Sequence, residues 1–225
     1  QEVVQAVADE ICAIWEAITA LVAEILDAAV AIANRFVASG ALLATRSRSE
    51  TRVTPADPDE AGLAGLPLVV LLDNFSASAS EVLAAALQDH AVATLVGEPS
   101  YGKGTVQTLK RIGEDRAVVK ITTAHYCSPS LRRIEHLELA NGDGDTVHSG
   151  IAPDLCVPLT ESERREVYGY LYGFSPPDEV LDELHAWESR EHVRLVDDPP
   201  DDRQLDAAVA LLSGTELELH GAPLQ

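Results

Sequence analysis

The first part of the chain carries apolar side chains at steps of three and four residues and contains neither proline nor glycine before Gly40. The apolar positions are Val4, Val7, Ile11, Ile14, Ile18, Leu21, Val22 and Ile25. This spacing is typical of an α-helix with one apolar face. One helix over residues 1–39 would be roughly 57 Å long, which exceeds a compact domain. We therefore expect a helical N-terminal segment, 1–39, that either breaks near residues 19–24 or projects from the body.

Polar residues interrupt the most apolar part of this segment, residues 12–37. They are Glu16, Glu24, Asp27, Asn34 and Arg35. Each charge would be costly inside a bilayer. We expect a buried or partner-facing helix and no membrane span.

Residues 40–158 alternate short apolar runs with turns, which predicts an α/β core. Gly40 fits the C-cap of the preceding helix, and residues 47–66, rich in proline and glycine, are expected to form a surface loop. Strands are expected at residues 41–46, 67–73, 91–96, 105–110 and 117–123, with a turn at 113–115 and a helix at 78–90. The strand–helix–strand run predicts a right-handed βαβ unit.

Residues 159–225 are expected to form a helical appendage without catalytic residues. Thr160 and Glu163 have the spacing of a capping box, which predicts a helix over residues 161–172. Further helices are expected at 178–190 and 202–213.

Composition narrows the class of partner. With 16 Lys and Arg against 37 Asp and Glu, the net charge is −21, which disfavours nucleic acid and anionic lipid as partners. Cys12, Cys127 and Cys156 show no paired spacing, so neither a zinc site nor a disulfide framework is expected. No signal peptide is visible, because the start is acidic and lacks the basic and apolar regions of one.

The candidate chemistry lies at Ser78. A buried strand, a small-residue turn and an opening helix would expose its hydroxyl beside the free N–H groups of the helix N-terminus. A serine needs a base, and Lys103, flanked by two glycines, follows 25 residues later. The lysine would have to be neutral, a state that burial in an apolar pocket favours. Strand alternation places Gln107 on the same face as Lys103, where it would orient the amine without adding charge.

A purely structural interpretation remains open for the same residues. Ser78 followed three residues later by Glu81 is also a capping box, whose only task is to begin a helix. Lys103 alone would be an ordinary solvated loop lysine.

Several motifs in one order resemble a known family. They are Ser76-Ala77-Ser78-Ala79-Ser80-Glu81, Ala86-Leu87-Gln88-Asp89, Val96-Gly97-Glu98, Gly102-Lys103-Gly104-Thr105-Val106-Gln107, Thr122-Thr123-Ala124-His125-Tyr126, Ser128-Pro129-Ser130 and Gly150-Ile151-Ala152-Pro153-Asp154. The chain resembles the C-terminal processing (tail-specific) peptidases, serine proteases of family S41 with a Ser–Lys dyad. The likeness is strong over residues 66–157 and weaker over 24–65.

The resemblance implies specific roles. Ser78 would be the nucleophile, Lys103 the base and Gln107 the orienting residue, while the Ala79 N–H would hold the oxyanion. It also implies a ClpP/crotonase-like fold, endoproteolysis near the C-termini of protein or peptide substrates, no metal or cofactor, and an exported, periplasmic or cell-envelope location.

The chain departs from the family before residue 24. The family's Asp-Leu-Arg-x-Asn-x-Gly-Gly strand and turn, which gives a second oxyanion N–H, is replaced by helix-forming residues 5–24, and no PDZ domain is found. Three interpretations therefore stay open. The chain is an active serine endopeptidase core, an inactive or truncated member that binds peptides, or a module that oligomerises through residues 1–39.

Overall fold

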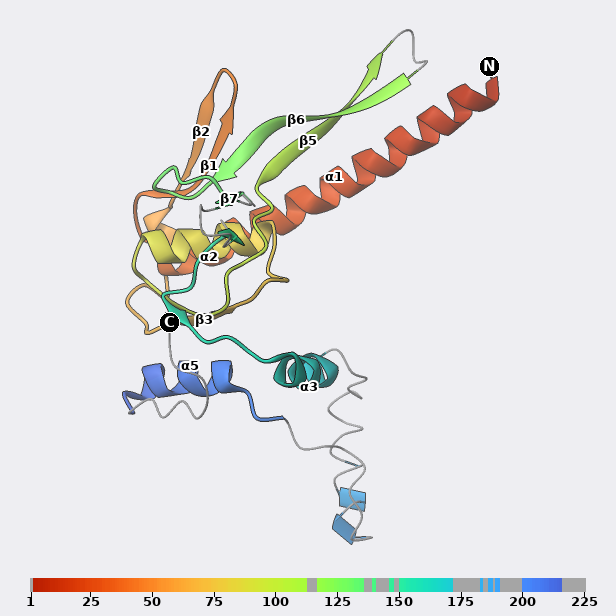
Figure 1. The fold of residues 1–225 in the computed structure, drawn as a ribbon. Coiled ribbons are helices and arrows are strands. Elements are labelled where there is room, and N and C mark those ends of the chain that lie inside the picture. Colours follow the sequence, from red (N-terminus) through yellow and green to blue (C-terminus); the bar gives the residue numbers. More distant parts are fainter. Residues whose placement is uncertain are drawn as a thin grey trace.

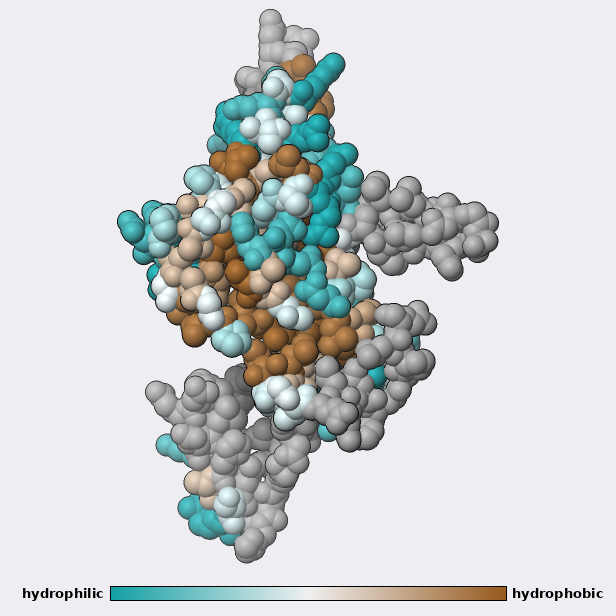
Figure 2. All heavy atoms as spheres, turned by 90° about the vertical axis from the view of Figure 1, so that its left-hand side faces the viewer, coloured by the Kyte–Doolittle hydropathy of each residue, from teal (hydrophilic) through white to brown (hydrophobic). Residues whose placement is uncertain are grey.

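The computed structural model describes residues 2–112, 117–135, 139–140, 146–147, 150–171 and 200–215, with a few separate positions between 183 and 190. It has a mixed α/β architecture (Figure 1). On the face shown in Figure 2, apolar side chains gather over the central part of the body.

The N-terminal segment is one unbroken helix, α1 (Glu2–Phe36). The expected break at residues 19–24 does not occur, and the alternative of a projecting helix is confirmed (Figure 1). Its C-terminal part packs on the core, where Ala29 and Ala33 are buried, as is Val37 just after the helix end. Among the described residues no helix is both long and apolar enough to cross a membrane. Gly40 lies beyond the helix end and is not its cap. It adopts a φ of +95°, and a Cβ there would lie 2.7 Å from the His90 ring.

An antiparallel sheet forms one side of the body in the order β2-β1-β6-β5. Its strands are β1 (Ala41–Ser47), β2 (Thr51–Pro55), β5 (Thr105–Ile112) and β6 (Ala117–Cys127). The predictions at 41–46, 105–110 and 117–123 are confirmed, and β6 continues beyond its predicted end. The surface loop expected over 47–66 is wrong in part, because β2 pairs with β1 there. All five residues of β2 are exposed, so the strand shows no alternation of buried and exposed positions.

The long β5–β6 hairpin extends in the same direction as α1 (Figure 1). A cation–π contact joins the two, with Lys120 Nζ 5.2 Å from the centre of the Trp15 ring. The turn expected at 113–115 lies outside the described residues.

A parallel sheet, in the order β3-β4-β9, carries the helix that follows the serine turn. Its elements are β3 (Val69–Leu72), α2 (Ala79–Asp89), β4 (Thr94–Gly97) and β9 (Leu155–Cys156). The parallel pairing of β3 with β4 confirms the strand–helix–strand prediction. Buried side chains of α2 pack against β1 and β4 and form the main core, with Leu43, Val82, Ala85 and Leu95 among its members. A further pair, β7 (Leu139–Ala140) and β8 (Thr146–Val147), was not predicted.

The C-terminal part has helices α3 (Glu161–Leu171) and α5 (Arg203–Ser213). The capping box at the start of α3 is confirmed: Thr160 N–H donates to Glu163 at 2.7 Å, and Glu163 N–H donates to the Thr160 hydroxyl at 3.3 Å. Helix α5 packs on the parallel sheet through Ala207. Most of the helix expected at 178–190 lies outside the described residues.

Candidate active site

Ser78 lies at the junction between the parallel sheet and α2, in an unusual backbone conformation. Its φ and ψ are 61° and −116°, whereas an ordinary helix N-cap has β-region angles. A non-glycine residue in this region is strained, and such strain is concentrated at functional sites. A sharp strand-to-helix turn of this kind is how hydrolases with a nucleophile elbow expose their serine. Helix capping alone does not require these angles.

The turn that precedes Ser78 is held by Asp73. Its Oδ1 accepts hydrogen bonds from Phe75 N–H at 3.0 Å and from the N–H and hydroxyl of Ser76 at 2.8 and 2.7 Å. The other oxygen accepts from the Tyr168 hydroxyl on α3. Burial alone would raise the pKa of the Asp73 carboxyl, but the hydrogen bonds from Tyr168 and Ser76 outweigh it and lower the pKa below its ordinary value. Ser76 is therefore a structural turn residue.

Glu81 connects the serine turn, residues 73–78, to the lysine loop, residues 98–104. It is fully buried and accepts four hydrogen bonds. The donors are Ser78 N–H at 2.8 Å, Ser100 Oγ at 2.5 Å, Gly102 N–H at 2.5 Å and Lys103 N–H at 2.7 Å. Ser78 N–H and Lys103 N–H donate to the same carboxylate oxygen of Glu81. The distance between their two nitrogen atoms is therefore at most the sum of the two hydrogen-bond lengths. The backbones of the two predicted catalytic residues are thus brought together.

The two glycines that flank Lys103 occupy positions that a larger residue would not fit. Gly102 has a φ of +88°, and a Cβ on Gly104 would lie only 1.7 Å from the Ile134 carbonyl oxygen. The lysine loop also contacts the serine turn directly, since Tyr101 N–H donates to the Ser76 carbonyl at 3.0 Å.

The side chain of Lys103 is exposed, in contrast to the apolar pocket that a neutral amine favours. Within the described part of the chain, its amine and the Gln107 amide have no hydrogen-bond partner, so the predicted bond between them is not formed. Thr105 and Gln107 lie on β5, whereas Lys103 precedes it and is held by a separate bridge to Glu135.

One of the two N–H groups that the resemblance implies as oxyanion donors is unpaired within the described residues. For the Ala79 N–H, at the first turn of α2, no acceptor is found among the described residues. The second donor that the resemblance implies would come from the segment before residue 24, and that segment is helical throughout α1.

Other residues of the motifs shared with the family connect loops to α2 through hydrogen bonds. The Gln88 amide donates to Asp154 at 2.9 Å, and Asp154 accepts from Leu95 N–H at 2.8 Å. Asp89 accepts from Ser130 N–H at 2.8 Å. Burial alone would raise the pKa of Asp89, but hydrogen bonds from Ser128 and Ser130 outweigh it and lower the pKa. Asp89 thereby connects the loop at Ser130 to the C-terminal end of α2.

The sequence interpretation missed the main role of Glu81 and all of that of Ser100. Glu81 was considered only as a capping residue, whereas its carboxylate also holds the lysine loop. A buried glutamate on the apolar face of a predicted helix was the signal that was available. Ser100 is buried as well, and its hydroxyl accepts from Ile151 N–H at 2.7 Å while donating to Glu81. Within the described residues no group of three or more metal-ligating side chains is found.

The serine turn, the strained Ser78 and the adjoining lysine loop define the class of a serine hydrolase-like α/β protein. The profile of Peptidase family S41 matches residues 24–157. The chain belongs to this family.

Curated relatives agree with that assignment. A carboxy-terminal-processing protease of Bartonella bacilliformis is 34% identical over 201 residues, which are 84% of this chain and 42% of the relative. The chloroplastic carboxyl-terminal-processing peptidase 3 of Arabidopsis thaliana is 43% identical over 89 residues, 40% of this chain and 15% of the relative. The chain thus spans less than half the length of these relatives.

Among solved structures, the photosystem II D1 C-terminal processing protease is similar, with 31% sequence identity. The match has a TM-score of 0.48 and covers 59% of this chain and 31% of that protein.

Proposed function

We propose that the chain is the core of a serine endopeptidase that cleaves proteins near their C-termini through a Ser78–Lys103 dyad. The observation that carries the proposal is the strained Ser78 at the start of α2, joined through Glu81 to the backbone of Lys103. Family membership adds the chemical class, and the names of the relatives add the position of cleavage.

The chemistry would run in two steps. Neutral Lys103 takes the proton of the Ser78 hydroxyl as Oγ bonds to the scissile carbonyl carbon, and the Ala79 N–H donates to the oxyanion. The C–N bond then breaks, Lys103 returns the proton to the leaving amine, and an acyl-enzyme remains. Water, deprotonated by Lys103, attacks the ester and releases Ser78. Gln107 would orient the amine once substrate covers the exposed lysine.

The test is covalent labelling of Ser78. The protein is incubated with a serine-directed phosphonate or sulfonyl fluoride at pH 8–9, and the adduct is measured by intact mass. We expect one adduct on the wild-type chain and none on Ser78→Ala. Lys103→Ala should lower the labelling rate by two or more powers of ten, since general-base catalysis contributes about that much.

Ser80→Ala is the matched control, since Ser80 is an exposed serine two residues from Ser78. Labelling that persists in Ser78→Ala, or that is unaffected by Lys103→Ala, would contradict the dyad. With no adduct on the wild-type chain, the inactive alternative would take precedence.

A second candidate function is self-association through α1. The exposed apolar positions on this helix alternate between steps of three and four residues, at Ile11, Ile14, Ile18, Leu21, Ile25, Ala28 and Ile32. One seam position holds isoleucine in every heptad, at Ile11, Ile18, Ile25 and Ile32, and the other holds Ile14, Leu21 and Ala28. This spacing is that of a coiled-coil seam. Glu10 and Glu24 lie beside this seam, both on the same side of it. In a parallel pair of helices they would face uncharged residues of the partner helix. Sedimentation over a range of concentrations tests this, and a constant monomer mass would contradict it.

We further propose a ClpP/crotonase-like arrangement of the core and an exported or cell-envelope location. The first is supported by the strand–helix–strand unit around Ser78. The second is supported by the bacterial and chloroplastic processing proteases among the relatives. Fractionation of cells that express the full-length protein tests the location.

A further inference from the structure

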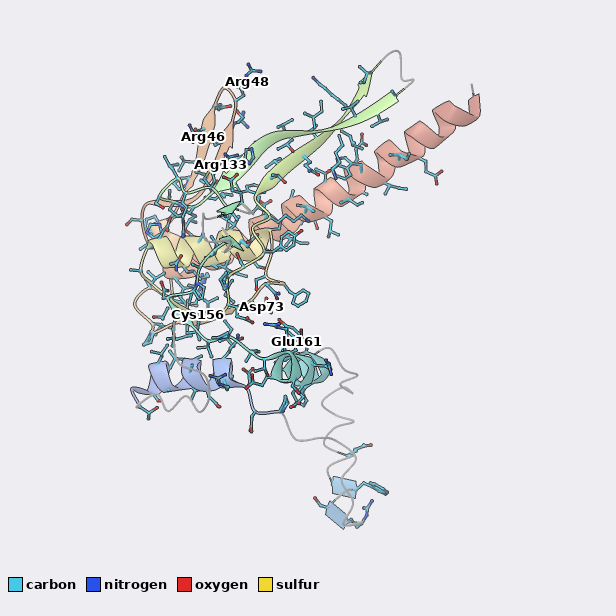
Figure 3. All side chains as sticks on the ribbon, in the orientation of Figure 1. Arg46, Arg48, Asp73, Arg133, Cys156 and Glu161 are labelled. Carbon is cyan, nitrogen blue, oxygen red and sulfur yellow. The ribbon has the colours of Figure 1, made fainter. Side chains whose placement is uncertain are left out.

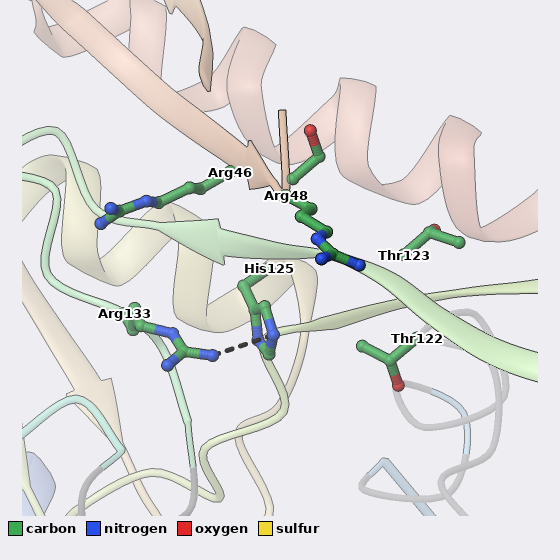
Figure 4. Close-up of a pocket in the computed structure, with 7 residues that line it drawn as sticks. Arg46, Arg48, Thr122, Thr123, His125 and Arg133 are labelled. Atoms are coloured by element: carbon green, nitrogen blue, oxygen red, sulfur yellow. Dashed lines mark hydrogen bonds between the residues drawn. The ribbon is translucent and has the colours of Figure 1, made fainter. Parts of the chain in front are cut away.

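A cavity of about 400 Å³ lies on the antiparallel sheet, apart from the serine turn, and its lining is basic and hydroxylic. It is lined by Arg46, Ser47, Arg48, Thr122, Thr123, His125 and Arg133 (Figure 4). No carboxylate is among these residues. In a chain with a net charge of −21, three arginines gathered in one cavity are a marked local reversal of charge.

Most of this positive charge is not neutralised by the protein. Within the described part of the chain, neither Arg46 nor Arg48 has an ion-pair partner. Arg133 pairs with Glu135 at 3.2 Å. A concave site with unpaired guanidinium groups is suited to carboxylate or phosphate oxygens, which these groups bind bidentately.

Arg133 also positions His125. Its guanidinium donates to His125 Nε2 at 2.9 Å (Figure 4), and since a guanidinium has no acceptor atom, Nε2 must be the acceptor. The proton of the neutral ring then lies on Nδ1, which is buried and has no partner among the described residues. His125, a residue that lines the cavity, therefore has one buried polar atom without a partner among the described residues, which calls for an explanation in a native structure.

An irregularity in β6 contributes two adjacent hydroxyls. The register with β5 shifts between Val106 and Gln107, so that Gln107 pairs with Thr122 and Thr123 is left as the extra residue of a bulge. In a regular strand, neighbouring side chains point to opposite faces. A bulge re-aims a side chain, and here both Thr122 and Thr123 line the cavity.

The cavity adjoins the lysine loop. Thr105, two residues after Lys103, pairs with His125, and Lys103 itself bridges to Glu135, the partner of Arg133. The labelled Arg46, Arg48 and Arg133 lie on the same side of the body, whereas Asp73 and Glu161 lie well away from them (Figure 3). The cavity and the lysine loop are thus connected through directly paired residues.

We propose that this cavity binds the carboxylate of an acidic peptide segment that lies beside the lysine loop. One part of this proposal, the path of the peptide past Lys103, rests on the proposed peptidase function. The binding of a carboxylate in the cavity does not. A volume of about 400 Å³ lies within the range of ligand pockets. The surrounding negative charge would repel an acidic peptide elsewhere on the surface, so the arginines would select its position.

Binding is tested without turnover on the Ser78→Ala protein. The probe is a fluorescent, unstructured peptide of about ten residues with two glutamates, compared with the same peptide carrying glutamine at those positions and with a C-terminally amidated form. Anisotropy is measured at one fixed ionic strength, since exposed charges are screened by salt.

We expect the glutamate peptide to bind about tenfold more tightly than the glutamine peptide. Arg46→Gln combined with Arg133→Gln should remove that difference. Arg165→Gln, which deletes an exposed arginine on α3 far from the cavity, should change affinity less than twofold. Because all three arginines are exposed, the melting temperatures should remain close to that of the parent.

Several results separate the possibilities. A loss of binding on amidation alone would assign the carboxylate to the C-terminus, and a loss on Glu→Gln replacement would assign it to the side chains. Equal binding of all three peptides, or arginine variants that bind as the parent does, would overturn the proposal. Binding of inorganic phosphate without any binding of the peptides would also overturn it. Unlabelled Ser78 in the wild-type chain together with selective peptide binding would reject the peptidase function and leave this site standing.

Discussion

At the scale of single residues, Glu81 controls the geometry of the candidate site. One carboxylate accepts the N–H of the predicted nucleophile and the N–H of the predicted base. A buried carboxylate is costly unless it is fully hydrogen-bonded, and here four donors surround it. Glu81 therefore positions the backbones of the two residues of the proposed dyad, and it has no need to touch a substrate.

We expect Glu81→Ala to lower the free energy of unfolding by about 3 kcal/mol or more, because it removes the acceptor of four hydrogen bonds, two of them buried and two half-buried. The measurement is urea denaturation followed by circular dichroism. Glu161→Gln, an exposed change in the first turn of α3, should stay within about 0.5 kcal/mol. A loss below about 1 kcal/mol for Glu81→Ala would show that other contacts hold the lysine loop.

At the scale of elements, the lysine loop depends on close backbone contact. A Cβ on Gly104 would lie 1.7 Å from the Ile134 carbonyl oxygen, whereas a Cβ on Gly169, inside α3, would meet nothing within 4 Å. Gly104→Ala should destabilise the protein by about 1–3 kcal/mol and slow the labelling of Ser78. Gly169→Ala should stabilise it by roughly 0.5–1 kcal/mol, since alanine is the better helix former. Thermal and urea unfolding of the pair check both signs, and a neutral Gly104→Ala would contradict the contact.

The elements also show where sequence reasoning succeeds and where it does not. Helix α2, with apolar residues on one face and Ser78 at its start, was predictable because its pattern and its end signals agree. Strand β2 was not, because an exposed edge strand buries no face and so has no alternation. The hydrogen bonds of Glu81 to the lysine loop, and the gathering of Arg46 with Arg133, depend on contacts between distant segments, which periodicity does not encode.

At the scale of the whole molecule, α3 is anchored to the body by two polar contacts. Tyr168 donates to Asp73, below the serine turn, and Arg164 contacts Glu98 after β4 at 2.7 Å. The Phe75 ring also packs edge-on against Tyr168, with 5.3 Å between ring centres. The C-terminal part of the chain is thereby connected to the turn that holds Ser78.

This anchor predicts a pH dependence that Tyr168→Phe exposes. The pKa of Asp73 is lowered in the folded state, because the hydrogen bonds from Tyr168 and Ser76 outweigh burial. The contribution of ionised Asp73 to the free energy of unfolding is fully present above its unfolded pKa, about 3.9. It is lost as the pH falls through the lower pKa of the folded state. Burial and the bond to Asp73 raise the pKa of Tyr168. The contribution of the protonated Tyr168 hydroxyl to the free energy of unfolding is complete below a pH of about 10 and is lost at higher pH.

The difference in unfolding free energy between wild type and Tyr168→Phe should therefore be about 1 kcal/mol between pH 5 and 9, roughly the value of one hydrogen bond. Solvent screening at the half-buried Asp73 keeps it from being larger. It should shrink below pH of about 4 and again above pH of about 10. Urea titrations at pH 3, 7 and 10.5 measure it, with Tyr170→Phe as control, since Tyr170 is an exposed tyrosine on the same helix. A non-zero difference that stays constant down to pH 3 would mean that the Tyr168 hydroxyl acts independently of the Asp73 charge. No difference at any pH would mean that Tyr168 stabilises α3 through its ring alone, and that the serine turn is held independently of the C-terminal helices.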